Sequence, residues 1–213
     1  MIIQKLKKKI TWAFLYYKYY YYSLLIISFF STIYCRLFFR LLGIKLQKGS
    51  IFWGIPRVLV YPGSKIFMGL KIKFRSAPMS NLIGLNRKTI ISTHHENAII
   101  QIGDNCGFSA VVIGARESIT IGNNVMAGAN VLITDFDWHS MKINERENGI
   151  PESKPIFIEN NVFIGYSSTI LKGVSIGENS IIGANSVVVK SIPANVIAAG
   201  NPCKVVRPIS NSN

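Results

Sequence analysis

A strict six-residue period runs through the C-terminal half of the chain and restricts its fold more than any other feature. Aliphatic residues recur at every sixth position, namely Ile158, Ile164, Ile170, Ile176, Ile182 and Val188. Small or β-branched residues lie two places before the last five of them, namely Val162, Ser168, Val174, Ser180 and Ser186. This period matches neither an α-helix, with about 3.6 residues per turn, nor the two-residue alternation of an ordinary strand.

Each group of six residues has the composition of a short strand followed by a turn. β-branched residues favour strands, whereas Gly and Asn tolerate the left-handed backbone angles that corners require. The turn positions hold Gly165, Gly177 and Gly183 and also Asn161, Asn179 and Asn185. Three such groups predict one triangular coil, with aliphatic side chains stacked inward about 4.8 Å apart.

The same phase recurs upstream at Ile121, Ala127 and Ile133, and more loosely at Ile102 and Phe108. Residues 114–118 offset it slightly, and a polar excursion at residues 135–155 interrupts it. Insertions in a repeat stack leave it as loops, which carry function more often than the coils do. We expect irregular leading coils at residues 49–98, the β-helix at 99–207 and a tail at 208–213.

The basic charge of the chain is confined to its N-terminal part. The net charge is +14, but residues 1–95 hold 16 basic residues and no acidic residue, and the remainder holds eight basic and ten acidic residues. The same part contains an uncharged, apolar and aromatic run at residues 19–35. Nucleic-acid binders rarely carry such a run, so this distribution favours an anionic membrane surface as the partner and argues against nucleic acid.

Residues 1–48 are expected to associate with a membrane. A helix of 17 residues is about 25 Å long, at the lower limit for a bilayer core of about 30 Å. Cations flank the run on both sides, namely Lys5, Lys7, Lys8 and Lys9 before it and Arg36, Arg40 and Lys45 after it. Since both flanks would stay in the cytoplasm, a peripheral, in-plane or re-entrant segment is favoured over a single span. The alternative is a buried helical hairpin packed on the body.

The repeat, the excursion with its histidine, and the segment from Ser191 to Lys204 resemble the hexapeptide-repeat acyltransferases. Within that group the chain looks most like the sugar O-acetyltransferases, such as the maltose and galactoside acetyltransferases, over about residues 81–207. The resemblance implies a left-handed parallel β-helix, a homotrimer, and acetyl-CoA bound in grooves between neighbouring subunits.

The resemblance places the catalytic histidine at His139, fifteen residues before Lys154. A free imidazole has a pKa of about 6.5, so its neutral form can take the proton of a sugar hydroxyl that attacks a thioester. Asp137 is expected to orient or steady the imidazole, with Glu152 a weaker candidate for the same role. By the resemblance, Asn81 and Ser109 approach the substrate.

The same alignment extends to the acetyl-CoA contacts, which it places at Tyr166, Ala184, Val189, Lys190, Lys204 and Arg207. Backbone groups of Ala184 and Val189 would contact the pantetheine chain, and the three cations would pair with phosphates. The chain departs from the family at Tyr166, where a small residue is commoner, and at Val189, commonly Thr. No metal is expected. The three cysteines, Cys35, Cys106 and Cys203, are widely spaced, which favours a reducing compartment and packing roles.

We therefore expect an acetyl-CoA-dependent O-acetyltransferase that modifies a sugar hydroxyl of a surface polysaccharide, such as a capsule, exopolysaccharide or O-antigen, or of its lipid-linked precursor. Its expected place is the cytoplasmic face of a bacterial membrane. The alternatives are an N-acetyltransferase of an amino sugar, a zinc carbonic anhydrase on the same helix, for which a closely spaced histidine pair in register is missing, and an inactive structural β-helix.

Overall fold

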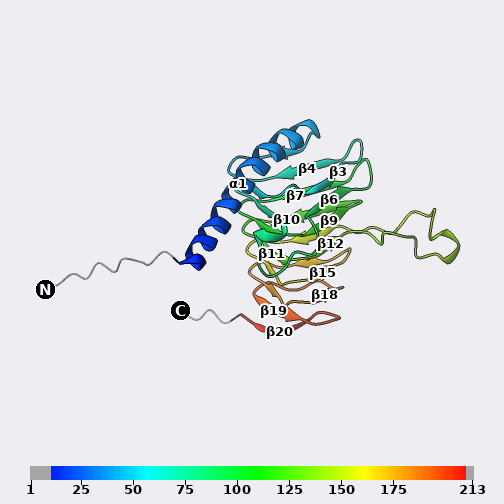
Figure 1. Cartoon of the computed structure of the whole chain (residues 1–213). Helices are drawn as coiled ribbons and strands as arrows, with labels where there is room; N and C mark the ends of the chain where they lie inside the picture. Colours follow the sequence, from blue (N-terminus) through cyan, green and yellow to red (C-terminus); the bar gives the residue numbers. More distant parts are fainter. Residues whose placement is uncertain (1–10, 210–213) are drawn as a thin grey trace.

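A stack of short parallel strands forms the body of the protein (Figure 1), and the computed structural model describes residues 11–209. Lys5, Lys7, Lys8 and Lys9 lie outside the described residues. The strands build three sheets, and successive strands up to β18 pass in turn from one sheet to the next. All strand pairs in the described part are parallel except the last, β19 with β20.

Sheet A contains, in stacking order, β1 (Lys45–Leu46), β4 (Lys65–Met68), β7 (Ile99–Ile102), β10 (Ser118–Ile121), β13 (Ile156–Ile158) and β16 (Ser175–Ile176). Sheet B contains β2 (Ile51–Trp53), β5 (Lys73–Arg75), β8 (Gly107–Ser109), β11 (Met126–Ala129), β14 (Phe163–Ile164), β17 (Ile181–Ile182), β19 (Val196–Ala199) and β20 (Lys204–Pro208). Sheet C contains β3 (Arg57–Leu59), β6 (Ile90–Thr93), β9 (Val112–Ala115), β12 (Leu132–Thr134), β15 (Thr169–Ile170) and β18 (Val187–Val188).

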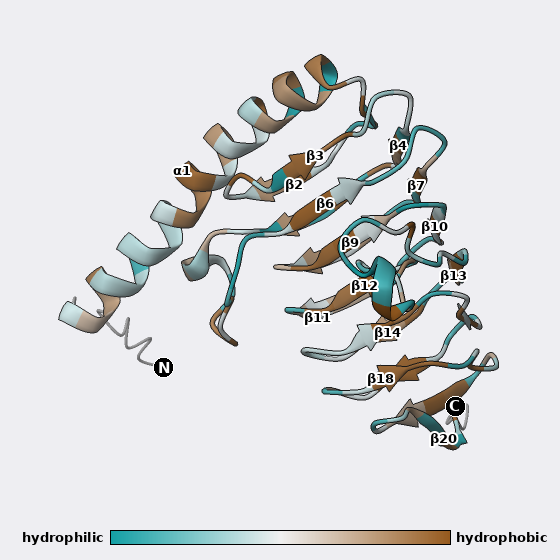
Figure 2. Cartoon of the chain, turned by 90° about the vertical axis from the view of Figure 1, so that its right-hand side faces the viewer, coloured by the Kyte–Doolittle hydropathy of each residue, from teal (hydrophilic) through white to brown (hydrophobic). Residues whose placement is uncertain are grey.

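The architecture is the left-handed parallel β-helix that the resemblance implies. Residues of the six-residue period lie in register between coils, as in the pairs Ile121 with Ile158 and Ile158 with Ile176. All six aliphatic positions from Ile158 to Val188 are buried. Figure 2 shows hydrophobic residues, in brown, recurring from strand to strand through the stack. Apolar burial along the axis of the helix therefore holds the coils together.

The corners confirm one part of the turn prediction and correct another. Asn161, Asn179 and Asn185 all have left-handed backbones, with φ between 56° and 59°. The repeat glycines Gly165, Gly177 and Gly183 are not among the residues with positive φ. Glycine is needed there for space, since a Cβ on Gly165 would lie 2.5 Å from the backbone nitrogen of Ala184 in the next coil.

The expected irregularity of residues 49–98 is mostly wrong. Strands β1 to β5 pair in register with the later coils, so the regular β-helix begins at Lys45. The departure is confined to residues 76–89, a loop that contains the 3-10 turn η1 (Pro78–Ser80). Sequence reasoning missed these coils because their inward positions in sheet B hold Phe52 and Phe74, which stack on each other and on Phe108 with ring centroids 5.1–5.4 Å apart and disguise the aliphatic period.

Helix α1 (Trp12–Leu41) closes the N-terminal end of the stack as one continuous helix of 30 residues. It is a single helix and not the helical hairpin that was the alternative expectation. Phe39 packs on Phe52 with ring centroids 5.4 Å apart, so it extends the internal phenylalanine stack. The Ser31 and Thr32 hydroxyls accept the backbone N–H groups of Gly54 and Phe52. By length and composition alone, α1 is long and apolar enough to cross a membrane.

Candidate active site

The excursion at residues 135–155 leaves the stack after β12 and projects from one side of the molecule (Figure 1, yellow-green). Its base is a short antiparallel ladder in which the backbone N–H of Asp137 donates to the carbonyl of Glu152 at 3.1 Å, and that of Lys154 donates to Asp135 at 2.8 Å. The 3-10 turn η2 (Ile143–Glu145) lies near its tip. The excursion is therefore a loop with an ordered neck.

His139 lies just beyond this neck, on the exposed part of the loop. Its Nδ1 lies 3.2 Å from the backbone carbonyl oxygen of Arg146. A carbonyl oxygen only accepts hydrogen bonds, so this contact requires a proton on Nδ1 and leaves the Nε2 lone pair of the neutral imidazole available. The loop backbone thus orients the ring in the tautomer that a general base needs.

Among the described residues, the carboxylate of Asp137 is paired with Lys172 rather than with the imidazole, so its expected orienting role stays a prediction. Lys172 also lies 3.3 Å from Glu152. Glu152 in turn pairs with Lys154 at 2.8 Å. Asp137 and Glu152 therefore tie the neck of the loop to Lys172 at the end of β15.

The ion pairs of this neck shift the pKa values of Glu152 and Lys172. Hydrogen bonds from Lys154 and Lys172 lower the pKa of Glu152 below its ordinary value. Partial burial alone would lower the pKa of Lys172, but hydrogen bonds to Asp137 and Glu152 outweigh it and raise that pKa. Both shifts stabilise the charged forms, so the neck stays ion-paired over the neutral range.

A buried carboxylate that sequence reasoning did not single out holds the start of the excursion. Asp135 is inaccessible to solvent and accepts the backbone N–H groups of Arg116 at 2.7 Å and Glu117 at 2.9 Å. Burial raises the pKa of Asp135, and these hydrogen bonds oppose the rise. The carboxylate therefore fixes the turn between β9 and β10 against the exit of the loop.

An aromatic cluster supports the same exit. The ring centroid of His94 lies 4.9 Å from that of Phe136 and 5.0 Å from that of Trp138. Burial, with the nearby Arg116 guanidinium, lowers the pKa of His94. His94 therefore packs within this cluster, and His95 accepts the backbone N–H of Asn97 at 3.3 Å.

The structure brings together the two residues expected to approach the substrate. The amide of Asn81 donates to the hydroxyl of Ser109 at 3.2 Å. Both line a groove of about 330 Å³ over sheet B, together with Lys73 and Arg75. In the same chain, His139 belongs to the loop that follows sheet C, so the groove and the candidate base lie on different edges of the triangular helix.

The residues expected to contact acetyl-CoA also divide between edges. Tyr166 and Ala184 follow β14 and β17 at the corner after sheet B, where Asn185 donates its backbone N–H to the carbonyl of Tyr166 at 2.8 Å. Hydrogen bonding from Ser167 and Asn130 lowers the pKa of Tyr166. Val189 and Lys190 follow β18, at the corner after sheet C, which is the corner from which the 135–155 loop leaves two coils earlier.

Lys204 and Arg207 lie on β20, which ends the described part of the stack. All residues of this strand are exposed. None of the four ion pairs among the described residues involves Lys190, Lys204 or Arg207. Their charges are therefore available to phosphates, as a nucleotide contact requires.

Comparisons with known proteins identify the kind of fold that carries these residues. The family model described as "Hexapeptide repeat of succinyl-transferase" matches residues 155–190. Over 114 residues the chain is 48% identical to the galactoside O-acetyltransferase of Escherichia coli K12. The aligned residues make up 53% of this chain and 55% of that protein. The chain carries a hexapeptide-repeat acyltransferase fold. It spans about half the length of the curated relatives it matches.

Two solved structures extend the similarity of this hexapeptide-repeat protein beyond the matched repeats. A hexapeptide-repeat acetyltransferase of Vibrio cholerae in complex with acetyl coenzyme A has a TM-score of 0.54 and 27% identity over 70% of this chain and 73% of that chain. A galactoside acetyltransferase in complex with coenzyme A has a TM-score of 0.50 and 32% identity over 72% of this chain and 66% of that chain. The resemblance to sugar O-acetyltransferases is thereby confirmed.

The cysteines take no part in the site. All three are buried and free of disulfides. Burial raises the pKa of Cys35 to about 12 and that of Cys106 to about 11, so both stay as thiols near neutral pH. A nucleophilic role needs the thiolate, and packing therefore accounts for them better.

Proposed function

We propose that this protein is an acetyl-CoA-dependent O-acetyltransferase whose general base is His139. The observation that carries the proposal is the contact between Nδ1 of His139 and the carbonyl of Arg146, which leaves Nε2 free to accept a proton. The fold shared with acetyltransferases that bind coenzyme A supports the donor.

In the proposed reaction, Nε2 of His139 takes the proton of a sugar hydroxyl while its oxygen attacks the carbonyl carbon of the thioester. A C–O bond forms and the C–S bond breaks. The imidazolium then returns the proton to the departing thiolate of coenzyme A, so no proton or charge is left over. Lys190, Lys204 and Arg207 would hold the phosphates of the donor, and Asn81 and Ser109 the acceptor.

Because the candidate residues divide between two edges of one chain, the proposed unit of function is a homotrimer. A neighbouring subunit would bring its sheet B groove toward the loop that carries His139. The observed separation of His139 from Asn81 and Ser109 supports this assembly, as does the resemblance to enzymes that bind acetyl-CoA between subunits.

The acceptor proposed is a hydroxyl of a surface polysaccharide or of its lipid-linked precursor, at the cytoplasmic face of a bacterial membrane. The long apolar helix α1 and the basic N-terminal part support this location. Enzymes that act on free sugars have no need of such a segment, whereas a lipid-linked acceptor is reached only at the membrane surface.

The first prediction concerns the base. Membranes that contain the protein should transfer label from radiolabelled acetyl-CoA to glycan, and His139→Ala should lower this rate about 10²–10⁴-fold, the usual contribution of a positioned general base. His95→Ala is the matched control, because the imidazole of His95 accepts a hydrogen bond within its own turn, and it should leave the rate unchanged. Labelling that His139→Ala does not lower would overturn the assignment, and label that resists mild alkali would indicate an amide rather than an ester.

A further inference from the structure

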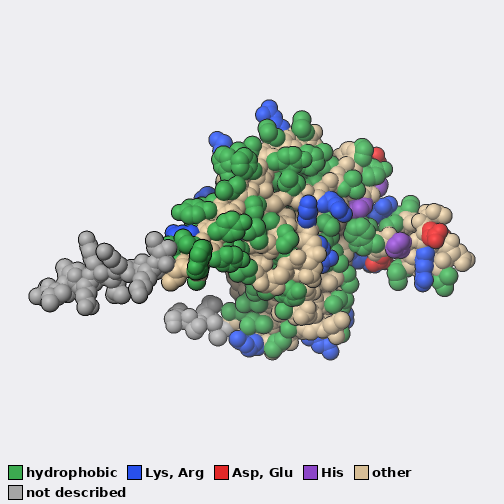
Figure 3. Space-filling model, in the orientation of Figure 1, with side chains coloured by type: hydrophobic (Ala, Val, Ile, Leu, Met, Phe, Trp, Pro, Cys, Tyr) green, Lys and Arg blue, Asp and Glu red, His purple; other side chains and the backbone are tan. Residues whose placement is uncertain are grey.

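A stripe of large side chains runs along the whole outward face of α1. Its members are three or four residues apart and each is at least 45% exposed, namely Trp12, Tyr16, Tyr19, Tyr22, Ile26, Phe30, Ile33, Leu37 and Leu41. We call this set the α1 stripe. Figure 3 shows hydrophobic side chains, in green, gathered over α1. A continuous exposed surface of this kind on a helix without acidic residues is typical of a helix that lies in a membrane interface.

The opposite face of α1 fixes how the helix can meet a membrane. Ser31, Cys35 and Phe39 are buried against the end of the β-helix. On the flank between this face and the stripe, Arg36 donates to the carbonyl of Ser50 at 3.4 Å. A crossing orientation of the C-terminal third would break these contacts. With the packing intact, the helix presents its stripe sideways, which favours an in-plane position.

The cations of α1 lie along one flank of the stripe. Lys18 and Arg36 are 18 residues apart, which is five turns of an α-helix, so they project in the same direction. Arg40 follows Arg36 by about one turn. With the α1 stripe immersed, this flank lies at the level of the lipid headgroups, where long cationic side chains reach phosphates.

A depression at the C-terminal end of the same flank collects four cations. Its volume is about 340 Å³ and its lining residues are Arg36, Arg40, Ile44, Lys45, Leu46, Gln47 and Lys48, without a carboxylate. We call it the cationic groove. Arg40 and Lys48 are exposed and form no ion pair among the described residues, whereas Lys45 packs over the ring of Phe67.

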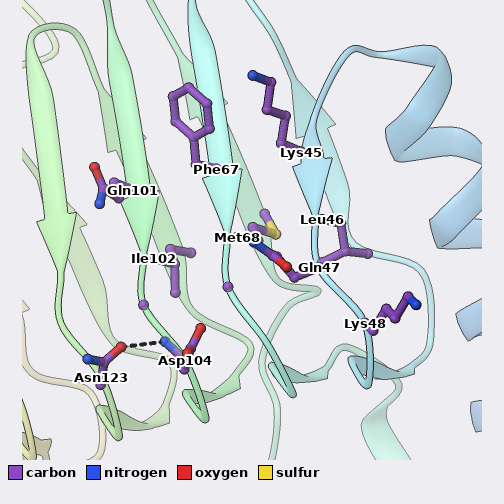
Figure 4. Close-up of a pocket in the computed structure, with 12 residues that line it drawn as sticks. Lys45, Leu46, Gln47, Lys48, Phe67, Met68, Gln101, Ile102, Asp104 and Asn123 are labelled. Carbon is purple, nitrogen blue, oxygen red and sulfur yellow. Dashed lines mark hydrogen bonds between the residues drawn. The ribbon is translucent and has the colours of Figure 1, made fainter.

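The cationic groove continues into a larger depression of about 620 Å³ along the ends of β1, β4 and β7. Figure 4 shows Lys45 and Lys48 at the end of this depression nearer α1 and Asp104 at the other. Asp104 is occupied by a hydrogen bond from the backbone N–H of Leu70 at 2.8 Å. Positive charge therefore concentrates beside the helix, and the only carboxylate that lines the depression lies away from it.

We propose that the cationic groove binds the phosphate of an anionic lipid headgroup while the α1 stripe lies in the same membrane surface. The inference rests on the membrane location proposed above. Two guanidinium groups and two ammonium groups match a phosphomonoester or diphosphate, which carries more charge and more acceptor oxygens than a phosphodiester. The cationic groove would therefore prefer lipids with a phosphomonoester or diphosphate headgroup over other anionic lipids of equal charge.

The test uses the full-length protein and vesicles of phosphatidylcholine with either phosphatidic acid or phosphatidylglycerol, at equal surface charge. We expect the wild type to prefer phosphatidic acid about tenfold, and Arg40→Gln/Lys48→Gln to lose this preference. Arg57→Gln/Lys88→Gln removes the same charge from exposed positions outside the groove and should keep it. An equal preference in wild type and groove variant would overturn the proposal.

Two further arms separate the alternatives. Inorganic diphosphate raises Tm of the wild type but not of the groove variant if the groove binds phosphate at all. That result together with no vesicle preference would assign the groove to a soluble phosphate and overturn the lipid assignment. Ile26→Glu/Phe30→Glu should abolish binding to every vesicle, whereas the control Ile143→Glu on the 135–155 loop should keep it. Acetyl transfer that depends on His139 is measured in a separate assay, so a failure of the lipid proposal can be told from a failure of the proposed enzyme activity.

Discussion

At the scale of single residues, the repeat glycines show how closely the coils approach. A Cβ at Gly165 would lie 2.5 Å from the backbone nitrogen of Ala184, whereas a Cβ at Gly107 would meet no atom within 4 Å. We therefore expect Gly165→Ala to lower the free energy of unfolding by about 1–3 kcal/mol through overpacking. Gly107→Ala is the matched control and should change it by less. The midpoint of urea unfolding measures both, and equal midpoints would contradict the steric argument.

Individual residues also show what the sequence can and cannot predict. The corner asparagines were predictable because a left-handed backbone has a known residue preference, as Asn161 and Asn185 confirm. The Asn81–Ser109 contact was predicted only as two separate substrate positions. Asp135 was missed, since its function depends on backbone N–H groups of residues 116 and 117 in the preceding coil, which no local pattern reveals.

At the scale of elements, Lys172 holds the neck of the 135–155 loop through its ion pairs with Asp137 and Glu152. We expect Lys172→Gln to lower kcat/KM by about tenfold to a hundredfold, because a small displacement of His139 misplaces the base. Lys142→Gln is the control, since Lys142 pairs with Glu145 at the exposed part of the loop. Steady-state kinetics and urea unfolding together distinguish a displaced loop from an unfolded protein, and equal kinetics for both variants would contradict the role of Lys172.

The pH dependence of this neck has a definite sign. The lowered pKa of Glu152 means that its contribution is present above the ordinary carboxylate pKa and is lost as pH falls through the lowered value. The raised pKa of Lys172 means that its contribution is present below the ordinary lysine pKa and is lost as pH rises through the raised value. The ratio of kcat/KM between wild type and Lys172→Gln should therefore be constant between these limits and shrink outside them.

Elements outside the aliphatic repeat were the hardest to predict. The later coils follow directly from their six-residue period, whereas the inward positions of β2 and β5 hold stacked phenylalanines, which have no such signature. The apolar run of α1 indicated a membrane segment, but its packing through Phe39 onto Phe52 is a tertiary contact between segments of different character. Composition alone does not show that one face of a hydrophobic helix closes a β-helix.

At the scale of the whole molecule, the separation of His139 from Asn81 predicts that active sites form between subunits. In a trimer made from His139→Ala and Asn81→Ala chains, every mixed ring has one junction at which an intact His139 meets an intact Asn81 of its neighbour. Random mixing of equal amounts makes three quarters of the rings mixed, with one working site in three, so about one quarter of wild-type activity should return.

Co-expression of the two inactive variants with different tags, followed by purification through both tags, isolates the mixed rings for assay. These should have about one third of wild-type activity, since each contains one intact site. A chain that carries both substitutions, co-expressed with itself, is the control and should remain inactive. Mixed rings without activity would mean that His139 and Asn81 must belong to the same chain. The loop that follows sheet C would then have to reach the groove over sheet B of its own chain.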